Sequence, residues 1–531
     1  MHIRRHSLGL SGCGGGTATD ERSADNTSRS LQAQAQAEAP PPVLFGNSFV
    51  ITNRTALDRV APDFKVGALL YAVNRHLSKI AKDYGKKPHD DKVFTLRPFQ
   101  VAADDVDGHN AVQDTDKVAK VGTVPVIYNT FRNLILKDGA FDPDTGTEPF
   151  RLIAVVNRLD LAGDFDMRGG GILAGADRRW FGEARLVFAV KGKLPDGSPL
   201  PMTVSAEYRL PALKTDAQTG AIVIDPDFKF DVGPASEDDW RIRRQLWAQV
   251  WQGLSASPVD SAEYATKLRG ILSWVAYGIA YDKDLIKTTE TAEHNLAFRT
   301  GERVREGVGV DQQGPLTPEF EYREFYLNDA WMLSTRKLRR EPFACANASQ
   351  TLADRIMQEW WSSTASMSWR YTLGERNLDA GEITDLKATC PSGKLPYGQV
   401  DDNKDTQLRA KFTRFTADTR WKPGTAKTPL NEKQMHSFAI GTCSGCHGKE
   451  TGTGGFHIAP AAGNAPAILS PFLTAPTSST PREQLQKYDE PTRRTALVAR
   501  FANGDAVSST DDPLLYDIGC RNVDQVCLPK P

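Results

Sequence analysis

The sequence predicts a multidomain protein, in which an α+β N-terminal region is followed by a small, mostly α-helical module. The chain has 531 residues, more than the roughly 250–300 beyond which a single hydrophobic core stops growing. Strand-like and helix-like segments are mixed over residues 43–425. This region forms either one domain or two domains that divide near residue 236. Apolar residues stand at helical spacing over 490–501, and we expect a separate module over residues 426–531 on the strength of the motif described below.

A β-hairpin is expected over residues 184–210. Residues 184–190 are rich in apolar and β-branched side chains, and residues 202–210 alternate like a half-exposed strand. Between them, Pro195-Asp196-Gly197 favours a turn, because proline presets φ and glycine tolerates positive φ. The same criteria predict further strands over 151–156 and 319–327.

Two amphipathic helices are expected after residue 236. The first spans residues 238–254 and begins at Asp238, a plausible N-cap. The second spans residues 261–276 and begins at Ser261, which has the same role. The first helix carries an apolar stripe that we expect to lie in the core, made of Trp240, Trp247, Val250, Trp251 and Leu254. Helical spacing also predicts helices over 66–83 and 351–361.

The composition is that of a globular protein without a strong electric field. The formal net charge is −1 and hydrophobic residues make up 40% of the chain, so attraction to nucleic acid or to anionic lipid is not expected. No apolar run reaches the roughly 20 residues that a membrane span needs. We therefore expect contact with a membrane only through a lipid anchor.

The N-terminus has features of an exported, tethered protein. Leu10-Ser11-Gly12-Cys13 resembles the lipobox of bacterial lipoproteins, in which the cysteine is lipidated. The apolar segment before Cys13 is shorter than signal peptides require, so we interpret residues 1–13 as a truncated signal-like segment; a chance match remains the alternative. Residues 14–42 are rich in small and polar side chains, which predicts a disordered tether.

Four of the seven cysteines are candidates for disulfide bonds. Proximity in the sequence suggests the pairs Cys345–Cys390 and Cys520–Cys527, although other connectivities are open. Disulfides persist in oxidising compartments, so this pairing agrees with export to the periplasm or the outer membrane. Four reduced, buried thiols are the alternative interpretation.

The motif with the clearest chemistry is Cys443-Ser444-Gly445-Cys446-His447. This CxxCH spacing is that of covalent c-type haem attachment. Two thiols three positions apart can reach the two vinyl groups of one porphyrin, and the following imidazole can bind its iron. A zinc site made of Cys443, Cys446 and a histidine (His447, His457 or His436) is one alternative, and a redox-active CxxC disulfide is another.

Residues 428–531 resemble a small c-type cytochrome domain, which implies one covalent haem c. The resemblance implies that 428–440 is the helix entering the haem site and that 490–501, ending at Asn503-Gly504, packs on it. It also implies that a carbonyl beside Pro460 accepts the proximal imidazole N–H. Its candidates for an apolar haem wall are Phe456, Ile458, Ile468, Leu469, Phe472 and Leu473.

The sequence departs from this resemblance at the sixth iron ligand. No methionine follows Met435 and no histidine follows His457. His457 is our first candidate for the sixth ligand. Ligation by two histidines would give the haem a lower reduction potential than ligation by histidine and methionine. The alternatives are ligation by His436 or Met435, a five-coordinate iron and a weaker sixth ligand. In each of them His457 would be a structural loop histidine.

These observations predict a haem-binding electron-transfer protein with a redox partner in the cell envelope. The whole chain also resembles bacterial envelope proteins that share this C-terminal motif. A non-enzymatic envelope lipoprotein, with the CxxCH segment as a structural zinc or disulfide site, is the second hypothesis. No catalytic constellation is recognised within 43–425, so electron transfer is favoured over an enzymatic role.

Overall fold

The computed structural model describes the parts of the chain that form one sheet and the elements packed on it. The described residues are 46–66, 69, 120–121, 124–125, 150–161, 181–194, 196–228, 236–277, 296–305, 316–327, 333–336, 412–416, 446–448, 453, 455–474 and 490–505. The expected helices over 351–361 and 428–440 lie outside the described residues. Only residues 66 and 69 of the helix expected over 66–83 are described. The expected module over 426–531 stays a prediction.

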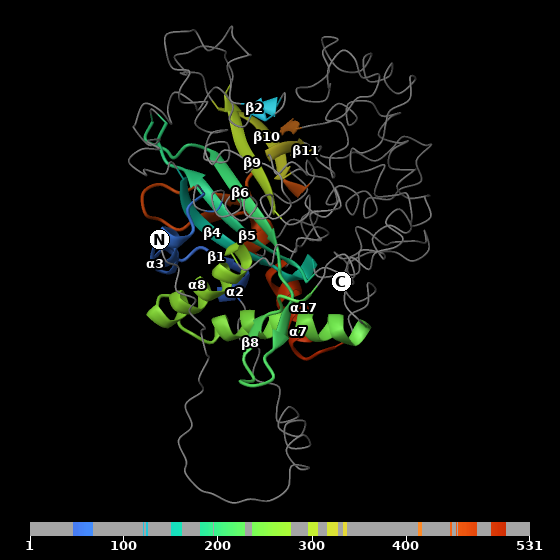
Figure 1. The fold of residues 1–531 in the computed structure, drawn as a ribbon. Coiled ribbons are helices and arrows are strands. Elements are labelled where there is room, and N and C mark those ends of the chain that lie inside the picture. Colours follow the sequence, from blue (N-terminus) through green and yellow to red (C-terminus); the bar gives the residue numbers. More distant parts are fainter. Residues whose placement is uncertain are drawn as a thin grey trace, which may run out of the picture.

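An eight-stranded antiparallel sheet is the centre of the described fold (Figure 1). Its strand order is β1-β4-β5-β6-β9-β10-β11, with β12 paired to β10 beside β11. The bounds are β1 Val50–Ile51, β4 Phe150–Arg158, β5 Glu183–Val190, β6 Met202–Arg209, β9 Leu296–Arg305, β10 Leu316–Leu327, β11 Leu333–Arg336 and β12 Phe412–Thr416. The strands expected from the sequence at β4, β5, β6 and β10 are confirmed.

The hairpin of β5 and β6 is confirmed, with one correction. The two strands pair in antiparallel register, and the turn closes through a 2.8 Å hydrogen bond from Gly197 N–H to Leu194 O. Gly197 has φ +82°, a conformation that favours glycine. The expectation that residues 202–210 are half-exposed is wrong, since nearly every residue of β6 is buried. Both faces of this strand are covered by other elements.

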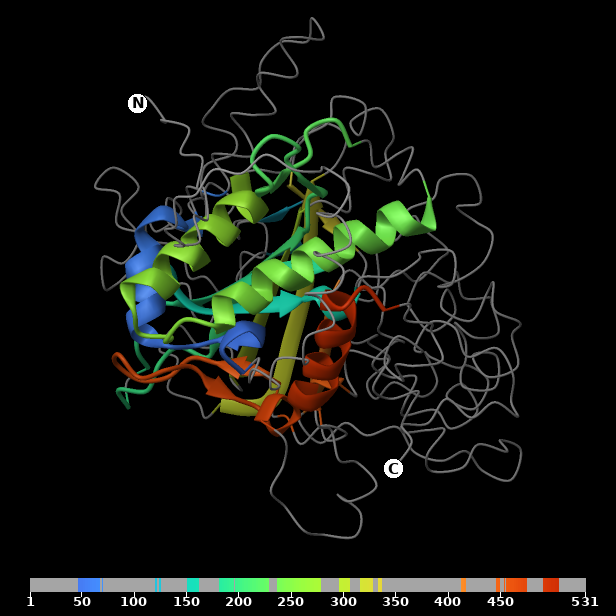
Figure 2. The ribbon, with the colours of Figure 1, turned by 90° about the horizontal axis from the view of Figure 1, so that it is seen from below.

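Helices cover the first face of the sheet (Figure 2). α7 (Glu237–Ser255) and α8 (Ala262–Tyr277) pack there with α3 (Arg54–Val60) and α17 (Glu490–Ala502). The tryptophan stripe of α7 is in the core as expected, with Trp247 and Trp251 fully buried. Trp247 Nε1–H also donates a 2.7 Å hydrogen bond to Pro211 O. Residues on both sides of position 236, and from α17, share this core.

The helix caps differ in part from those expected. Ser261 Oγ accepts a 3.0 Å hydrogen bond from Tyr264 N–H, as an N-cap does. The N-cap of α7 is Ser236 rather than Asp238, because Ser236 Oγ accepts from Asp239 N–H at 3.1 Å. Asp238 lies in the first turn and pairs with Arg241. α17 ends as expected at Asn503-Gly504, where Gly504 has φ +75°.

Replacing the cap of α7 gives a first test of this arrangement. Ser236→Ala is expected to lower the free energy of unfolding by about 1 kcal/mol, because an amide at the helix start loses its acceptor. Asp238→Asn should cost only a few tenths of a kcal/mol, the value of an exposed pair within a helix. Urea unfolding followed by circular dichroism measures both. A larger loss for Asp238→Asn than for Ser236→Ala would contradict the cap assignment.

The second face of the sheet is covered by the segment that follows the CxxCH motif. β13 (Ile458–Ala459), β14 (Ile468–Leu469) and α15 (Pro471–Thr474) pack there. Their apolar contacts are with side chains of β4 and β5 that point away from the helices, namely Ile153, Ala154, Val156, Val187 and Ala189. Arg151 ties the segment further, by donating to the carbonyls of Ala461 and Gly463.

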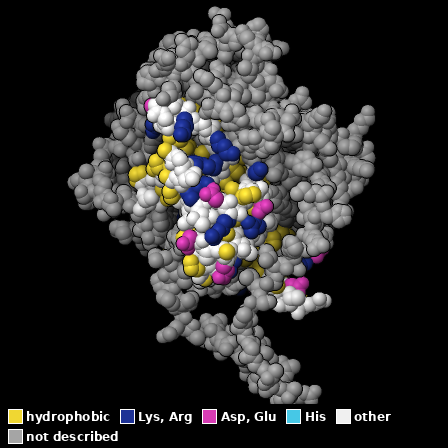
Figure 3. Space-filling model, turned by 90° about the vertical axis from the view of Figure 1, so that its left-hand side faces the viewer, with side chains coloured by type: hydrophobic (Ala, Val, Ile, Leu, Met, Phe, Trp, Pro, Cys, Tyr) yellow, Lys and Arg dark blue, Asp and Glu magenta, His cyan; other side chains and the backbone are white. Residues whose placement is uncertain are grey.

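Short elements complete the described fold. They are α2 Gly46–Phe49, η1 Ala61–Asp63, β2 Lys120–Val121 with β3 Val124–Pro125, η4 Leu159–Leu161, and β7 Leu213–Thr215 with β8 Ile222–Ile224. None of the helices among the described residues is long and apolar enough to cross a bilayer. The face drawn in Figure 3 mixes basic, acidic and apolar side chains.

Candidate functional site

His447, the last residue of the CxxCH motif, lies against aromatic side chains of the sheet. Its ring is nearly parallel to that of Phe320, with centroids 5.9 Å apart and planes at 12°. Tyr322 is two positions further along β10 and has its ring centroid 5.0 Å from that of His447. Residues i and i+2 of a strand point to the same side, so β10 presents both rings to the motif.

Gly455 fixes the orientation of the His447 ring through two hydrogen bonds. Gly455 N–H donates to His447 O at 2.9 Å, and the His447 Nδ1–H donates to Gly455 O at 2.7 Å. Protonation at Nδ1 makes Nε2 the nitrogen with the lone pair that a metal takes. From the sequence, a carbonyl beside Pro460 was expected to accept the His447 Nδ1–H. The acceptor is instead the carbonyl of Gly455, five residues before Pro460, because the loop comes back to His447 at that residue.

The loop comes close to the sheet because two glycines make room for Phe320. A Cβ atom built on Gly455 would lie 2.4 Å from the ring of Phe320, and one built on Gly301 would lie 2.6 Å from it. Gly455 also has φ +102°, which L side chains rarely adopt. Phe320 is therefore enclosed between a strand and the loop, and it is 1% exposed.

His457 bonds at both of its ring nitrogens. Nε2 lies 3.3 Å from Cys446 Sγ, and Nδ1 lies 2.9 Å from Ser470 Oγ. When Nδ1–H donates to Ser470, Nε2 accepts from the thiol; in the other tautomer both bonds reverse. The His457 ring also packs on Phe472, and its centroid lies 4.5 Å from that of His447.

Both histidines are held in the neutral form that metal ligation requires. Burial lowers the pKa of His447 to about 4, with the charges of Arg299 and Arg185 acting in the same direction against the hydrogen bond to Gly455. Burial likewise lowers the pKa of His457 well below its usual value, and His447 and Arg494 add to the effect.

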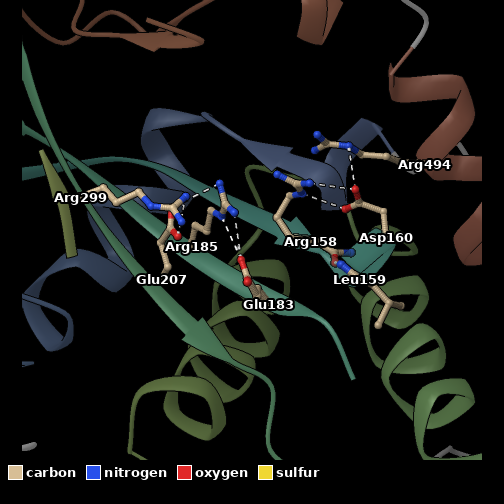
Figure 4. Close-up of polar contacts among 9 residues, drawn as sticks. Arg158, Leu159, Asp160, Glu183, Arg185, Glu207, Arg299 and Arg494 are labelled. Atoms are coloured by element: carbon tan, nitrogen blue, oxygen red, sulfur yellow. Dashed lines mark hydrogen bonds and ion pairs between the residues drawn. The ribbon is translucent and has the colours of Figure 1, made fainter. Parts of the chain in front are cut away.

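Figure 4 shows a network of buried and partly buried ion pairs. Its arginines are close enough to His447 and His457 for their charges to lower the pKa of both. Glu207 on β6 binds Arg185 of β5 at 3.3 Å and Arg299 of β9 at 3.0 Å, and Arg185 also binds Glu183 at 2.9 Å. Burial alone would raise the pKa of Glu183, but the charges of the neighbouring arginines, Arg185 first, outweigh it and lower that pKa.

A second part of the network joins the C-terminal helix to the sheet. Arg158 binds Asp160 with two hydrogen bonds of 2.9 and 3.1 Å, and Arg494 of α17 lies 3.8 Å from the same carboxylate. Asp160 and Arg494 are almost fully buried. α17 is therefore fixed to the end of β4 by charge as well as by apolar packing.

Of the site residues expected from the sequence, Cys446, His447 and His457 are brought together. Cys443 lies outside the described residues, as do Cys13 and the expected disulfide cysteines Cys345, Cys390, Cys520 and Cys527. Within the described ranges, no group of three or more His, Cys, Asp or Glu side chains is arranged to hold a metal ion.

The donor set around His447 fits a haem chemically. A thiol precedes the imidazole, the imidazole is neutral, and its Nδ1–H bond to a backbone carbonyl is the outer contact that orients a metal-bound histidine. Of the expected haem-wall residues, Ile458, Phe472 and Leu473 are buried against the sheet, whereas Ile468 is 60% exposed. Ile468 is therefore poorly placed for such a wall.

Sequence reasoning missed several residues of this site. Phe320 and Tyr322 are an aromatic pair at i and i+2 of a predicted strand, which is a usable signal. The acidic and basic residues of the β5–β6 hairpin, such as Glu183 and Arg185, alternate with apolar ones and were a second signal. Nothing local marks Ser470 as the partner of His457.

Comparison with known proteins gives no relative. No family model matches the chain, no curated protein matches it, and no solved structure matches it. The functional interpretation therefore depends on the residues of the site.

Proposed function

We propose that the chain is a haem-binding electron-transfer protein with one c-type haem, attached through Cys443 and Cys446 and ligated by His447. The observation that carries the proposal is the hydrogen bond from His447 Nδ1–H to Gly455 O, at 2.7 Å. It prepares Nε2 of the residue that follows a CxxC pair to bind iron. The haem, when bound, supplies one-electron Fe(II)/Fe(III) chemistry.

The protein's own residues would orient the imidazole of His447 for a bound haem. Gly455 fixes the ring plane, and the rings of Phe320 and Tyr322 lie against the imidazole. Burial, together with the charges of Arg299 and Arg185, lowers the pKa of the imidazole to about 4, which favours its neutral form. Fixed ligand orientation and a shielded site are the features by which a protein sets a metal's reduction potential.

The sequence suggested His457 as the sixth ligand, but ligation by His457 would require a rearrangement of the site. Imidazoles on opposite sides of one iron have ring centroids about 6 Å apart, since each metal–nitrogen bond is about 2 Å. The His447 and His457 centroids are 4.5 Å apart. Ligation by His457 would need the two rings to separate.

Export is part of the same proposal. Covalent attachment of haem to CxxCH takes place outside the bacterial cytoplasm, in the compartment where disulfides Cys345–Cys390 and Cys520–Cys527 would persist. Lipidation at Cys13 would anchor the chain to the envelope, where we propose that a redox protein is its partner. Residues 43–425 would then serve partly as the wall of the haem site.

One observation favours the second hypothesis, a structural zinc or disulfide site in a non-enzymatic lipoprotein. Cys446 Sγ lies 3.3 Å from a nitrogen of His457, whose ring centroid is 4.5 Å from that of His447. Within the described ranges the three side chains are not arranged to hold a metal ion, so a zinc site would need them to shift. Thiolate and imidazole are the ligands that zinc prefers. Elemental analysis separates the two: one zinc per chain without iron would support this alternative.

The test of the haem proposal is loss of the covalent cofactor. The exported Cys443→Ala/Cys446→Ala chain is expected to lose essentially all haem that survives acid–acetone extraction, because neither thiol of the motif remains to bond the porphyrin. The pyridine haemochrome spectrum measures this. Ser444→Ala, which leaves CxxCH intact, should keep it. A double variant with an undiminished covalent haem band would refute the proposal.

A further inference from the structure

We propose that His457 is a positioning residue that holds the thiol of Cys446 for haem attachment, and that it is not the sixth ligand of the iron. This inference rests on the proposed function, because it concerns how the same site is filled. Its basis is the 3.3 Å contact between His457 Nε2 and Cys446 Sγ. Proximity of this kind, with the reacting atom fixed, is a large contribution to reactions between bound groups.

The imidazole of His457 is anchored from both its side chain and its backbone. Ser470 Oγ bonds Nδ1 at 2.9 Å, and Ser470 N–H donates to His457 O at 2.9 Å. β13 begins directly after His457 and β14 ends directly before Ser470, and the two strands pair Ile458 with Leu469. Ser470 therefore holds both the ring and the backbone of His457, which gives the imidazole the fixed position that it needs to orient the Cys446 thiol.

The anchor itself is fixed in turn. Leu473 N–H and Thr474 Oγ1 both bond to Ser470 O, at 2.9 and 3.2 Å, and Ser470 is 6% exposed. Cys446, His457 and Ser470 thus form a chain of contacts from a thiol, through an imidazole, to a buried hydroxyl. This is the arrangement by which proteins orient a nucleophile through a neighbouring group.

The position of the ring argues against ligation. His457 bonds the thiol directly before His447, and the 4.5 Å between the two ring centroids leaves no space for an iron atom between them. Moving His457 to the opposite side of a haem would break its bonds to both Cys446 and Ser470.

The reaction in question is formation of the thioether between Cys446 and a haem vinyl group. It is an addition in which every atom of the thiol and of the vinyl group is retained, so no further reagent is needed. The Cys446 S–H adds across a vinyl double bond: sulfur bonds the carbon attached to the porphyrin ring, and the hydrogen goes to the terminal carbon. The carbon–carbon double bond becomes a single bond. His457 acts by holding the sulfur where the vinyl group arrives.

The experiment compares His457→Gln and Ser470→Ala in the full-length exported chain. Mass spectrometry of the peptide that contains Cys443 and Cys446 gives the ratio of doubly to singly attached haem. That ratio is expected to fall about fivefold in each variant, the factor to which a hydrogen bond of about 1 kcal/mol corresponds. The axial-ligand signature in the electron paramagnetic resonance spectrum of the ferric protein is expected to stay as in the wild type.

Three results distinguish the possibilities. Two intact thioethers with an altered axial signature in His457→Gln would overturn the inference and make His457 the ligand; no change in either readout would overturn it as well. If His457→Gln does not fold, Ser470→Ala decides, since it keeps the imidazole. Ser255→Ala, a buried serine of α7 on the other side of the sheet, is the matched control. A wild-type chain without covalent haem would instead refute the proposed function.

Discussion

Gly455→Ala is expected to lower the free energy of unfolding by about 3 kcal/mol. A φ of +102° is unfavourable for an L residue, by about 1–2 kcal/mol. The new methyl group would also lie 2.4 Å from the Phe320 ring, and overpacking of a buried site costs about 1–3 kcal/mol. Urea unfolding of the full chain measures the sum.

The same substitution should disturb the histidine. Because Gly455 bonds both the backbone and the ring of His447, a displaced loop withdraws the acceptor that orients the imidazole. We expect the axial-ligand signal of the haem-loaded variant to broaden or disappear. Gly463→Ala is the matched control, since Gly463 also has positive φ but no atom within 4 Å of the added Cβ. Equal losses in the two variants would contradict the contact with Phe320.

Glu207→Gln is expected to cost about 3 kcal/mol. Glu207 is 5% exposed and binds Arg185 and Arg299. Removing one charge from a buried pair costs about 3–5 kcal/mol. We expect a cost at the lower end of this range, because the side chains of Arg185 and Arg299 are still 19% and 25% exposed to solvent. The urea midpoint measures the loss.

An exposed pair supplies the control for this prediction. Asp227 binds Lys214 at 3.2 Å but is 85% exposed, and such pairs contribute little. Asp227→Asn should leave the unfolding midpoint unchanged within error. If Glu207→Gln were as harmless as Asp227→Asn, the network of ion pairs around Glu207 would not be part of the stable structure.

Patterns within short stretches of sequence correctly predicted the β5–β6 hairpin and helix α7. The β5–β6 hairpin followed from an apolar, β-branched segment before Asp196-Gly197 and an alternating segment after it, and Gly197 does adopt positive φ. The stripe of Trp247 and Trp251 placed α7 in the core. The error over the exposure of β6 has a physical cause, since alternation of apolar and charged residues also fits a strand whose charged face is buried among ion pairs.

The site could be predicted only in part, because its contacts join distant segments. The CxxCH spacing identified Cys446 and His447 without any structure. The support of His447 by Phe320, more than a hundred residues away in the sequence, has no local signal. The acceptor Gly455 was missed because the expectation relied on a nearby proline rather than on the φ that the loop adopts.

The most direct test of the central claim is the intact mass of the exported, full-length chain. We predict the mass of the polypeptide, with any lipid, plus one iron protoporphyrin that stays attached after denaturation. A mass accounted for by the polypeptide and lipid alone, in protein matured where c-type haem is attached, would contradict the claim.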